Sequence, residues 1–420
     1  MRRLTFIASR GLMALVLSTL VRAEARAENW PGWRGPTGVG VSAEQDLPTT
    51  WDAKKGDHVL WKAPLGETNG HSSPIVWGDR VFLTTAAKQS HAEEEAKAIP
   101  AHFLNCFQLS DGKLLWKTPI EGGQQTAGYA IYATPTPITD GHAVYCWFGS
   151  GVAAAVDFDG KLLWRQVRPG PFKLNPGLCS SPALYQDTML LLCDQGGGGW
   201  LQALDKKTGE IKWEQKRPKH SYNNSTPILI HVHGQPQLLI QASNQLQGLD
   251  PASGEPIWWC TTNGFGSTPA VSKGLIYSDS GNGENGAVVA DDGKGDVTAT
   301  HLKWHSKKTP SQYSSAVISG DFVYRAQKPG LIECRRLSTG DEVFSERAEG
   351  VSVTSSPVAT AGGLIYFGNS GRSYVIKASD KFDVVAVNNL NDGDNAASMA
   401  VSPGRLIIRG DHWLFCLGKP

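Results

Sequence analysis

The chain has 420 residues, with 47 glycines, 24 prolines and 14 tryptophans, and 19% of its residues are charged. This composition excludes a disordered chain, because it combines enough apolar surface for a folded core with many turn residues. The formal net charge is +1 and the sequence has no basic tract. Both features argue against nucleic acid or an anionic membrane surface as a partner.

Residues 1–27 have the pattern of an export signal. They begin with the positively charged MRRLTFIASR, continue with the 11-residue run GLMALVLSTLV, and end in the A-x-A-like cleavage site Ala25-Arg26-Ala27. Eleven residues are too few to span a bilayer, although a short uncleaved anchor is the alternative. Cleavage removes five Arg and one Glu, which leaves 35 basic and 38 acidic side chains and a formal net charge of −3. We therefore expect a periplasmic or secreted protein with no transmembrane span.

The seven cysteines do not predict a disulfide framework or a metal site. The first is Cys106, so no cysteine lies at the cleavage site, and we expect no lipid anchor of that kind. The set is odd in number and scattered, and it contains no C-x-x-C pair of the kind used for zinc or c-type haem. Cys179 and Cys193 flank a predicted hairpin and could approach each other. Burial as small apolar residues inside strands is the simpler interpretation.

One phrase recurs along the mature chain. It reads HSSPIVWGDRVFL at 71–83, and closely similar phrases follow at intervals of 41 to 61 residues. A repeat of this length is typical of a modular architecture. Measured at the proline position, the eight copies fall at 74, 135, 182, 227, 269, 316, 357 and 399.

A second phrase closes most repeats: an apolar pair, a glycine-containing turn and an aromatic, as in LSDGKLLW at 109–116. Each repeat therefore holds four short apolar or β-branched segments separated by turn residues, which predicts four strands. Four strands per repeat is typical of a propeller blade. We expect the closing tryptophans to pack between neighbouring blades, at positions 116, 164, 213, 258 and 304.

The two chain ends predict how the ring closes. HVLWKAPL at 58–65 resembles a closing strand with no strands before it, whereas residues 398–417 lack a closing strand. The sequence thus predicts an all-β, eight-bladed β-propeller of four-stranded blades at 58–420, with strand 58–65 completing the C-terminal blade. A seven-bladed ring would leave one fragment unpaired. Residues 28–57 form an N-terminal extension, and 86–101 insert a charged loop or short helix into blade one.

These repeats resemble those of the pyrroloquinoline-quinone-like (PQQ-like) β-propellers. The resemblance rests on SSPIVWGDRVF, DGKLLW and LDKKTGEIKW and covers residues 29–420. NWPGWRGPTGVGVS at 29–42 and DGKGDVTATHLKW at 292–304 are similar to a secreted bacterial branch of the family. The resemblance implies the propeller fold, but this fold hosts many functions.

Two classes of relative have different implications. Quinoprotein dehydrogenases hold PQQ and calcium on the ring axis and oxidise alcohols or sugars, commonly with a disulfide between adjacent cysteines. This chain has no adjacent cysteines, and DDGKGD at 291–296 lacks the calcium-loop spacing. Outer-membrane assembly propellers are lipoproteins that bind protein partners, whereas this chain lacks the anchoring cysteine. We therefore predict neither a cofactor nor a metal, and PQQ with calcium stays an unsupported alternative.

Any ligand site is expected at the rim of the central funnel, where each blade enters its axis-lining strand. Aromatic and amide groups gather there, and they suit a sugar, a peptide or a flat polar ligand. Mutual satisfaction of these groups with ordered water is the alternative. The candidate ligand-binding residues are His71, Tyr132, Cys179, Asn224, Phe265, Tyr313, Thr354 and Asn395.

The sequence favours an exported, non-catalytic propeller, a monomer that serves as a scaffold for an envelope protein or saccharide. No residue pair forms a convincing nucleophile and base, so no catalytic residue is assigned. A PQQ-dependent oxidoreductase acting on alcohols or sugars and a carbohydrate-binding propeller are the two alternatives.

Overall fold

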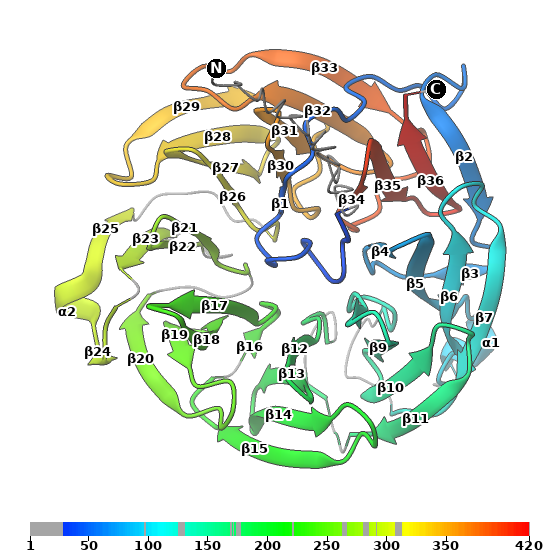
Figure 1. Cartoon of the computed structure of the whole chain (residues 1–420), viewed down its shortest axis with the longest axis horizontal. Coiled ribbons are helices and arrows are strands. Elements are labelled where there is room, and N and C mark those ends of the chain that lie inside the picture. The colour runs from blue at the N-terminus through cyan, green and yellow to red at the C-terminus, as the bar shows by residue number, and fades with distance from the viewer. Residues whose placement is uncertain are drawn as a thin grey trace, which may run out of the picture.

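The strands of the chain are arranged as a ring of sheets around a central axis (Figure 1). The computed structural model describes residues 28–95, 98–124, 131–168, 170, 172–173, 178–220, 222–262, 267–279, 285–290, 292–306 and 313–419. The predicted export signal at 1–27 lies outside these residues. Among them, no helix is both long and apolar enough to cross a membrane.

Seven blades each take their four main strands from one continuous stretch of chain. Blades 1 to 4 comprise β4 (Ile75–Trp77), β5 (Arg80–Ala87), β6 (His102–Gln108) and β7 (Leu114–Ile120); β8 (Ile138–Thr139), β9 (Ala143–Trp147), β10 (Val152–Asp157) and β11 (Leu162–Val167); β12 (Ala183–Tyr185), β13 (Thr188–Gln195), β14 (Gly199–Asp205) and β15 (Ile211–Arg217); and β17 (Ile228–Val232), β18 (Gln235–Gln241), β19 (Gln245–Leu249) and β20 (Pro256–Thr261). Blades 5 to 7 comprise β21 (Ala270–Ser272), β22 (Leu275–Ser278), β23 (Asn285–Ala290) and β25 (Leu302–Ser306); β26 (Val317–Ser319), β27 (Phe322–Gln327), β28 (Leu331–Arg336) and β29 (Glu342–Arg347); and β30 (Val358–Thr360), β31 (Leu364–Phe367), β32 (Arg372–Lys377) and β33 (Val384–Asn389).

The two ends of the chain share the remaining sheet, which we call the closing sheet. It consists of β34 (Ala400–Ser402), β35 (Arg405–Arg409), β36 (Trp413–Gly418) and the N-terminal β2 (Val59–Pro64). β2 runs antiparallel to β36, with Lys62 opposite Phe415. The ring is thus closed by hydrogen bonds between segments more than 300 residues apart.

The predicted count of eight four-stranded blades is wrong. The described residues form seven blades, each from one continuous stretch of chain, and the two chain ends share the remaining sheet. The uniform count of four strands is also wrong, because four sheets carry a fifth strand that sequence periodicity did not indicate. These additions are β1 (Val41–Ser42) beside β30, β3 (Thr68–Asn69) beside β5, β16 (Tyr222–Asn223) beside β13, and β24 (Gly295–Asp296) beside β20.

The second residue of each repeated phrase has a structural role at the axis. Its Ser or Thr hydroxyl accepts a hydrogen bond from the backbone N–H of the equivalent residue in the preceding sheet, at 2.8–3.0 Å. The bonds form an uninterrupted circle through residues 73, 136, 181, 226, 268, 315, 356 and 398. The phrase therefore recurs because every sheet contributes one link to this axial ring.

Tryptophans pack between neighbouring sheets, as predicted from their spacing. The indole N–H of Trp116 donates to the carbonyl of Phe158 in the next blade at 2.9 Å, and Trp61 does the same to Leu109 at 2.8 Å. Gly112 has φ +74, and a Cβ on it would lie 2.5 Å from the Trp61 ring. Glycine is therefore required in this turn by both backbone conformation and the neighbouring indole.

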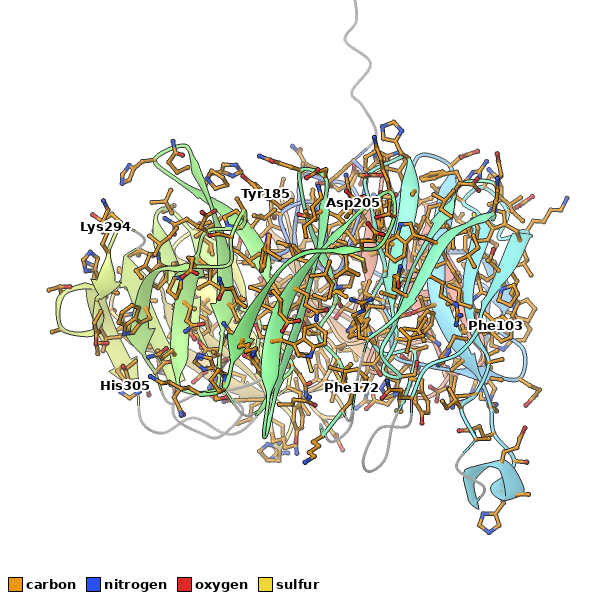
Figure 2. The ribbon with its side chains drawn as sticks, turned by 90° about the horizontal axis from the view of Figure 1, so that it is seen from below. Phe103, Phe172, Tyr185, Asp205, Lys294 and His305 are labelled. Atoms are coloured by element: carbon orange, nitrogen blue, oxygen red, sulfur yellow. The ribbon has the colours of Figure 1, made fainter. Side chains whose placement is uncertain are left out.

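The N-terminal segment 30–40 lies across one end of the axis (Figure 1). Trp30 exchanges backbone hydrogen bonds with Val76 of blade 1, and Arg34 Nη2 donates to the carbonyl of Ala316 in blade 6 at 2.5 Å. Figure 2 shows the molecule from the side, with Tyr185 and Asp205 on this face and Phe172 on the opposite one. We call them the turn face and the rim face. Because segment 30–40 covers the axis on the turn face, a ligand would approach the axis from the rim face.

Two insertions extend the ring. The insertion predicted at 86–101 includes α1 (His91–Glu95), which projects from the rim face in Figure 2. In blade 5, α2 (Thr298–His301) follows β24, whose parallel pairing with β20 places Gly295 opposite Trp258. β24 thereby covers part of the outer edge of blade 4, a device that protects an exposed sheet edge.

Candidate functional site at the rim face

The structure shifts one of the predicted rim positions. Thr136, not Thr134, occupies the axial ring in blade 2, and Ile138 pairs with Tyr145 as Ile75 pairs with Phe82 in blade 1. The equivalent of His71 is therefore Thr134 rather than Tyr132. The sequence TPTP contains two prolines; the prediction places the repeat on Pro135, whereas the structure places it on Pro137. Tyr132 is 9% exposed and lies edge-on to His102, with ring centroids 5.8 Å apart.

The other predicted rim residues differ widely in exposure. Tyr313 is 60% exposed, and the Lys328 ammonium lies 5.5 Å from its ring centroid. Asn395 is 4% exposed, whereas His71, Cys179, Asn224 and Thr354 are half-buried. Phe265 lies outside the described residues. Whether any of them binds a ligand stays a prediction.

Half-burial and hydrogen bonding restrict what these rim side chains can do. Burial raises the pKa of Cys179 to about 12, so its thiol is protonated at neutral pH and is a poor nucleophile. The seven cysteines, Cys179 and Cys193 among them, are not in disulfides. The Thr354 hydroxyl lies 3.0 Å from that of Ser352, and the Asn224 Oδ1 atom is buried without a hydrogen-bond partner.

His71 and Asn395 are brought together at the junction between the closing sheet and blade 1. Asn395 Nδ2 donates to the carbonyl of Gly70 at 3.2 Å and to Asp411 Oδ1 at 3.1 Å. Burial, and then the positive charge of Arg409, lower the pKa of His71 to about 4 against the opposing effect of Asp411. His71 is therefore neutral at physiological pH. At this junction, two predicted residues lie close to the buried charge of Arg409.

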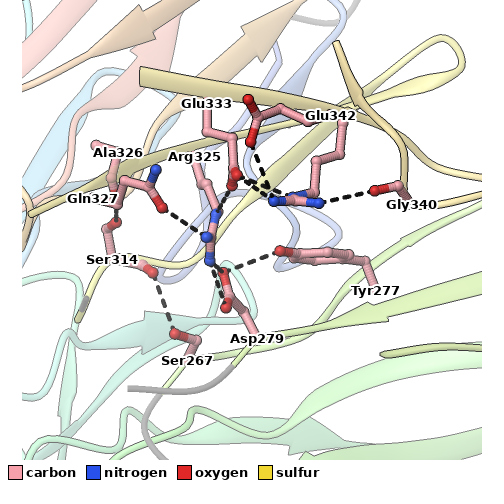
Figure 3. Close-up of polar contacts among 11 residues, drawn as sticks. Ser267, Tyr277, Asp279, Ser314, Arg325, Ala326, Gln327, Glu333, Gly340 and Glu342 are labelled. Atoms are coloured by element: carbon pink, nitrogen blue, oxygen red, sulfur yellow. Dashed lines mark hydrogen bonds and ion pairs between the residues drawn. The ribbon is translucent and has the colours of Figure 1, made fainter. Parts of the chain in front are cut away.

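Among the described residues, the buried arginines that the sequence analysis did not single out include Arg217, Arg325 and Arg409, each at a junction between sheets. At the junction of blades 5 and 6, Arg325 is 1% exposed, and its Nη1 donates to both oxygens of Asp279 at 2.8 Å (Figure 3). Its Nε donates to Glu333, which also accepts from Arg335 at 2.6 Å. Burial alone would lower the pKa of Arg325, but the carboxylates of Asp279 and Glu333 raise it above its usual value.

The junction of blades 3 and 4 has the same character. Arg217 donates two parallel hydrogen bonds to Asp194, from Nε to Oδ1 at 2.5 Å and from Nη2 to Oδ2 at 3.0 Å. Its Nη1 donates to Gln247 Oε1 in the next blade at 3.0 Å. Asp194 is fully buried. A sequence signal existed for these groups, because a charged residue within or directly after the apolar second strand recurs in LLLCD, LIYSD, FVYR and RLIIR.

Comparison with known proteins supports a propeller family. The family model described as "Outer membrane protein assembly factor BamB" matches residues 36–167 and 100–346. The crystal structure of BamB from Moraxella catarrhalis is similar with a TM-score of 0.61 at 16% identity, over 86% of this chain and 97% of that one. Quinohemoprotein alcohol dehydrogenase from Comamonas testosteroni is similar with a TM-score of 0.67 at 12% identity, over 94% and 81% of the two chains. No curated protein matches the sequence. At these identities the solved structures show the fold alone.

The acidic residues that the structure describes do not fit the calcium ion that a quinoprotein resemblance implies. Calcium takes six to eight oxygen ligands, several of them carboxylates. Within the part of the chain that the structure describes, no group of three His, Cys, Asp or Glu residues could hold a metal ion. The buried carboxylates Asp194, Asp279 and Glu333 are instead paired with arginines. No catalytic step is therefore derived through PQQ or calcium.

Proposed function

The chain belongs to the family described as outer membrane protein assembly factor BamB, and from this premise we propose that it is an exported scaffold that binds a protein partner in the cell envelope without catalysing a reaction. The family match over residues 36–167 and 100–346 carries the proposal. The dehydrogenase alternative is supported by likeness of fold only, and fold does not determine function. The carbohydrate-binding alternative rests on the aromatic and amide groups of the rim.

Export is part of the same proposal. The A-x-A-like site before Glu28 supports removal of residues 1–27 and a periplasmic or secreted location. The Glu28 carboxylate accepts hydrogen bonds from the Ser42 hydroxyl and from the backbone N–H of Ala43, the latter at 3.2 Å. Glu28 is therefore attached to the folded body, as the first residue of a trimmed chain could be.

The rim face is the surface we propose for the partner. The opposite face carries segment 30–40 over the axis, with Trp30 fully buried against blade 1. The rim face offers the exposed ring of Tyr313 beside Lys328, and exposed aromatic rings are enriched at protein interfaces.

Site-specific photo-crosslinking in the producing cell tests the proposal. A benzoylphenylalanine replaces Tyr313 in one strain and Leu163, 47% exposed on the outer strand β11, in a matched strain. We expect a discrete adduct with one envelope protein from position 313 and none from position 163. An adduct only from position 163 would overturn the rim face as the docking surface, and no adduct from either would overturn the scaffold function.

A further inference from the structure

Most outer strands of the ring are protected from pairing with another chain. The strands β2, β7, β11, β15, β25 and β29 each contain at least one Lys, Arg or Glu, and charges on an edge strand discourage such pairing. The uncharged β20 is instead covered by β24, and the Val297 N–H that follows β24 donates to the carbonyl of Trp259 at 2.9 Å. Each of these edges thus carries a charge or an added strand.

The outer strand of blade 7 has neither protection along most of its length (Figure 1). β33 has the sequence VVAVNN, which contains no charged residue. Val384, Val385 and Val387 are 38%, 39% and 49% exposed. Among the described residues, only Asp52 pairs with the outer edge of β33, through a parallel bridge to Asn389 at the end of the strand. An exposed apolar edge of this kind is a template for a further strand.

Blade 4 shows where a further strand would pair with β33. In both outer strands the register shifts at the second residue, so Trp259 of β20 corresponds to Val387 of β33. Because the carbonyl of Trp259 faces its added strand, we expect the backbone groups of Val387 to face outward as well. The bridge at Asn389 agrees with this expectation, since backbone direction alternates every two residues along a strand.

A surface cavity of about 520 Å³ lies beside this position. It is lined by Val387 and Asn388 of β33 and by residues of segment 50–58. The Asn388 side chain fixes the start of this segment: its Oδ1 accepts from the backbone N–H of Trp51 at 3.0 Å, and its Nδ2 donates to the carbonyl of Thr49 at 2.9 Å. The cavity is therefore continuous with the open edge of β33 and has a fixed wall.

The cavity combines an apolar wall with acidic groups. Trp51 and Val387 contribute the apolar wall, and Asp52 and Asp57 contribute carboxylates. The Lys55 ammonium lies 3.8 Å from Asp52 Oδ2, but its side chain is 72% exposed, so it offsets the acidic charge only weakly. This lining suits a long basic side chain, whose stem packs on apolar groups while its charge faces the carboxylates.

We propose that the outer edge of β33 docks an extended segment of a protein partner, which adds as a parallel strand beside residues 384–387 and places a basic side chain in the cavity. The parallel direction follows that of β24 on β20 and of Asp52 on β33 itself. Backbone hydrogen bonds supply affinity in this mode of recognition, and the cavity supplies specificity for one side chain. Two copies of this chain related by a two-fold axis would pair their β33 strands antiparallel, so a second copy does not match this direction. The surface differs from the rim-face site around Tyr313, and the two proposals are tested separately.

Nuclear magnetic resonance of the full chain, expressed with its export signal and labelled with nitrogen-15 in valine, tests the docking directly. The probe is a blocked peptide with the order valine, threonine, valine, threonine, arginine, which places the arginine toward Asn388 in a parallel pairing. We expect a saturating shift of the Val387 amide signal and at least tenfold slower hydrogen exchange at that amide. Two control peptides, one with methylated backbone nitrogens and one with glutamate in place of arginine, should each bind at least tenfold more weakly.

Two variants make the result specific. Val387→Lys gives β33 the kind of charge that most outer strands carry, so we expect at least tenfold weaker binding of the arginine peptide, measured at the Val385 amide. Leu163→Lys, at a 47% exposed position of β11, is the matched control and leaves binding unchanged.

Equal binding of the methylated peptide would overturn the strand pairing, and equal binding of the glutamate peptide would overturn the basic side chain in the cavity. No response of the wild type, or unchanged binding in Val387→Lys, would overturn the docking surface. Slow exchange of the Val387 amide without peptide, together with a dimeric mass that disappears on dilution, would show that a second copy occupies the edge instead. The crosslink from position 313 is independent of each of these outcomes.

Discussion

The junction of blades 5 and 6 and the closing junction treat a buried arginine in opposite ways. Arg325 has two carboxylates and an amide around its guanidinium, with Gln327 Oε1 accepting from Nη2 at 2.7 Å. Arg409 is equally buried, yet its partners are two carbonyls and a hydroxyl. In the first junction, carboxylates neutralise the charge of Arg325, and each of its three guanidinium nitrogens has a hydrogen-bond partner. The second leaves the guanidinium charge without a carboxylate among its hydrogen-bond partners in the described residues.

The largest effect is expected when the complete network is broken. Arg325→Met leaves Asp279 and Glu333 buried without their main cation, although Arg335 still reaches Glu333. An uncompensated buried charge costs about 3–5 kcal/mol of unfolding free energy. Chemical unfolding followed by tryptophan fluorescence measures the loss. Arg347→Met, exposed on β29 of the same blade, is the control and should change stability by less than about 0.5 kcal/mol.

A smaller effect is expected at the closing junction. Arg409→Met removes hydrogen bonds to Ser72 and Thr84, but among the described residues it leaves no carboxylate without its hydrogen-bond partner. We expect a loss of about 1–2 kcal/mol, because unsatisfied carbonyls are less costly than unpaired carboxylates. If Arg409→Met and Arg325→Met lose the same free energy of unfolding in the same experiment, the two junctions do not differ in how their buried arginines are compensated.

The sequence predicted the parts of the fold that repeat. Strand spacing, the interblade tryptophans and the complementary chain ends are local patterns, so they could be identified without coordinates. The fifth strands were missed because β1 and β24 pair parallel with strands far away in the chain and have no periodicity of their own. The blade 2 register was wrong by two residues, since only the hydrogen bond from Ser73 to Thr136 distinguishes the two prolines of TPTP.

The candidate site was predicted less well than the fold, for a physical reason. His71 and Asn395 were found because rim positions follow from the repeat. Arg409 was not, because its role depends on which groups surround it. RLIIR and FVYR look alike in sequence, but Asp279 reaches Arg325, whereas no described carboxylate forms a hydrogen bond to Arg409. Pairing across sheets is set by tertiary structure, which a strand pattern does not contain.

The axial ring gives a test in which the two junctions should behave alike. Ser73→Ala removes the acceptor for the Ser398 N–H at the closing junction, and Ser315→Ala removes the acceptor for the Thr268 N–H between blades 5 and 6. Each leaves one buried N–H unsatisfied, so we expect a loss of about 1 kcal/mol in both. Ser402→Ala, a buried serine of β34 whose hydroxyl bonds no described residue, is the control. A much larger loss for Ser73→Ala would show that the chain ends are held more weakly than the continuous blades.

The smallest effect at neutral pH is expected for His71. Its pKa of about 4 in the folded protein lies below the usual 6.5, so the unfolded chain takes up a proton first as the pH falls. The stability that neutral His71 contributes is therefore complete above about pH 6.5 and declines between about 6.5 and 4. His71→Gln should have the same melting temperature as the wild type at pH 8. Between pH 7 and pH 4.5, its melting temperature should fall by less than that of the wild type. His102, whose pKa burial also lowers to about 4, is present in both proteins and cancels from the difference. If the two melting curves shift equally with pH, His71 is not held neutral beside Arg409, and the charge at the closing junction is more screened than its burial indicates.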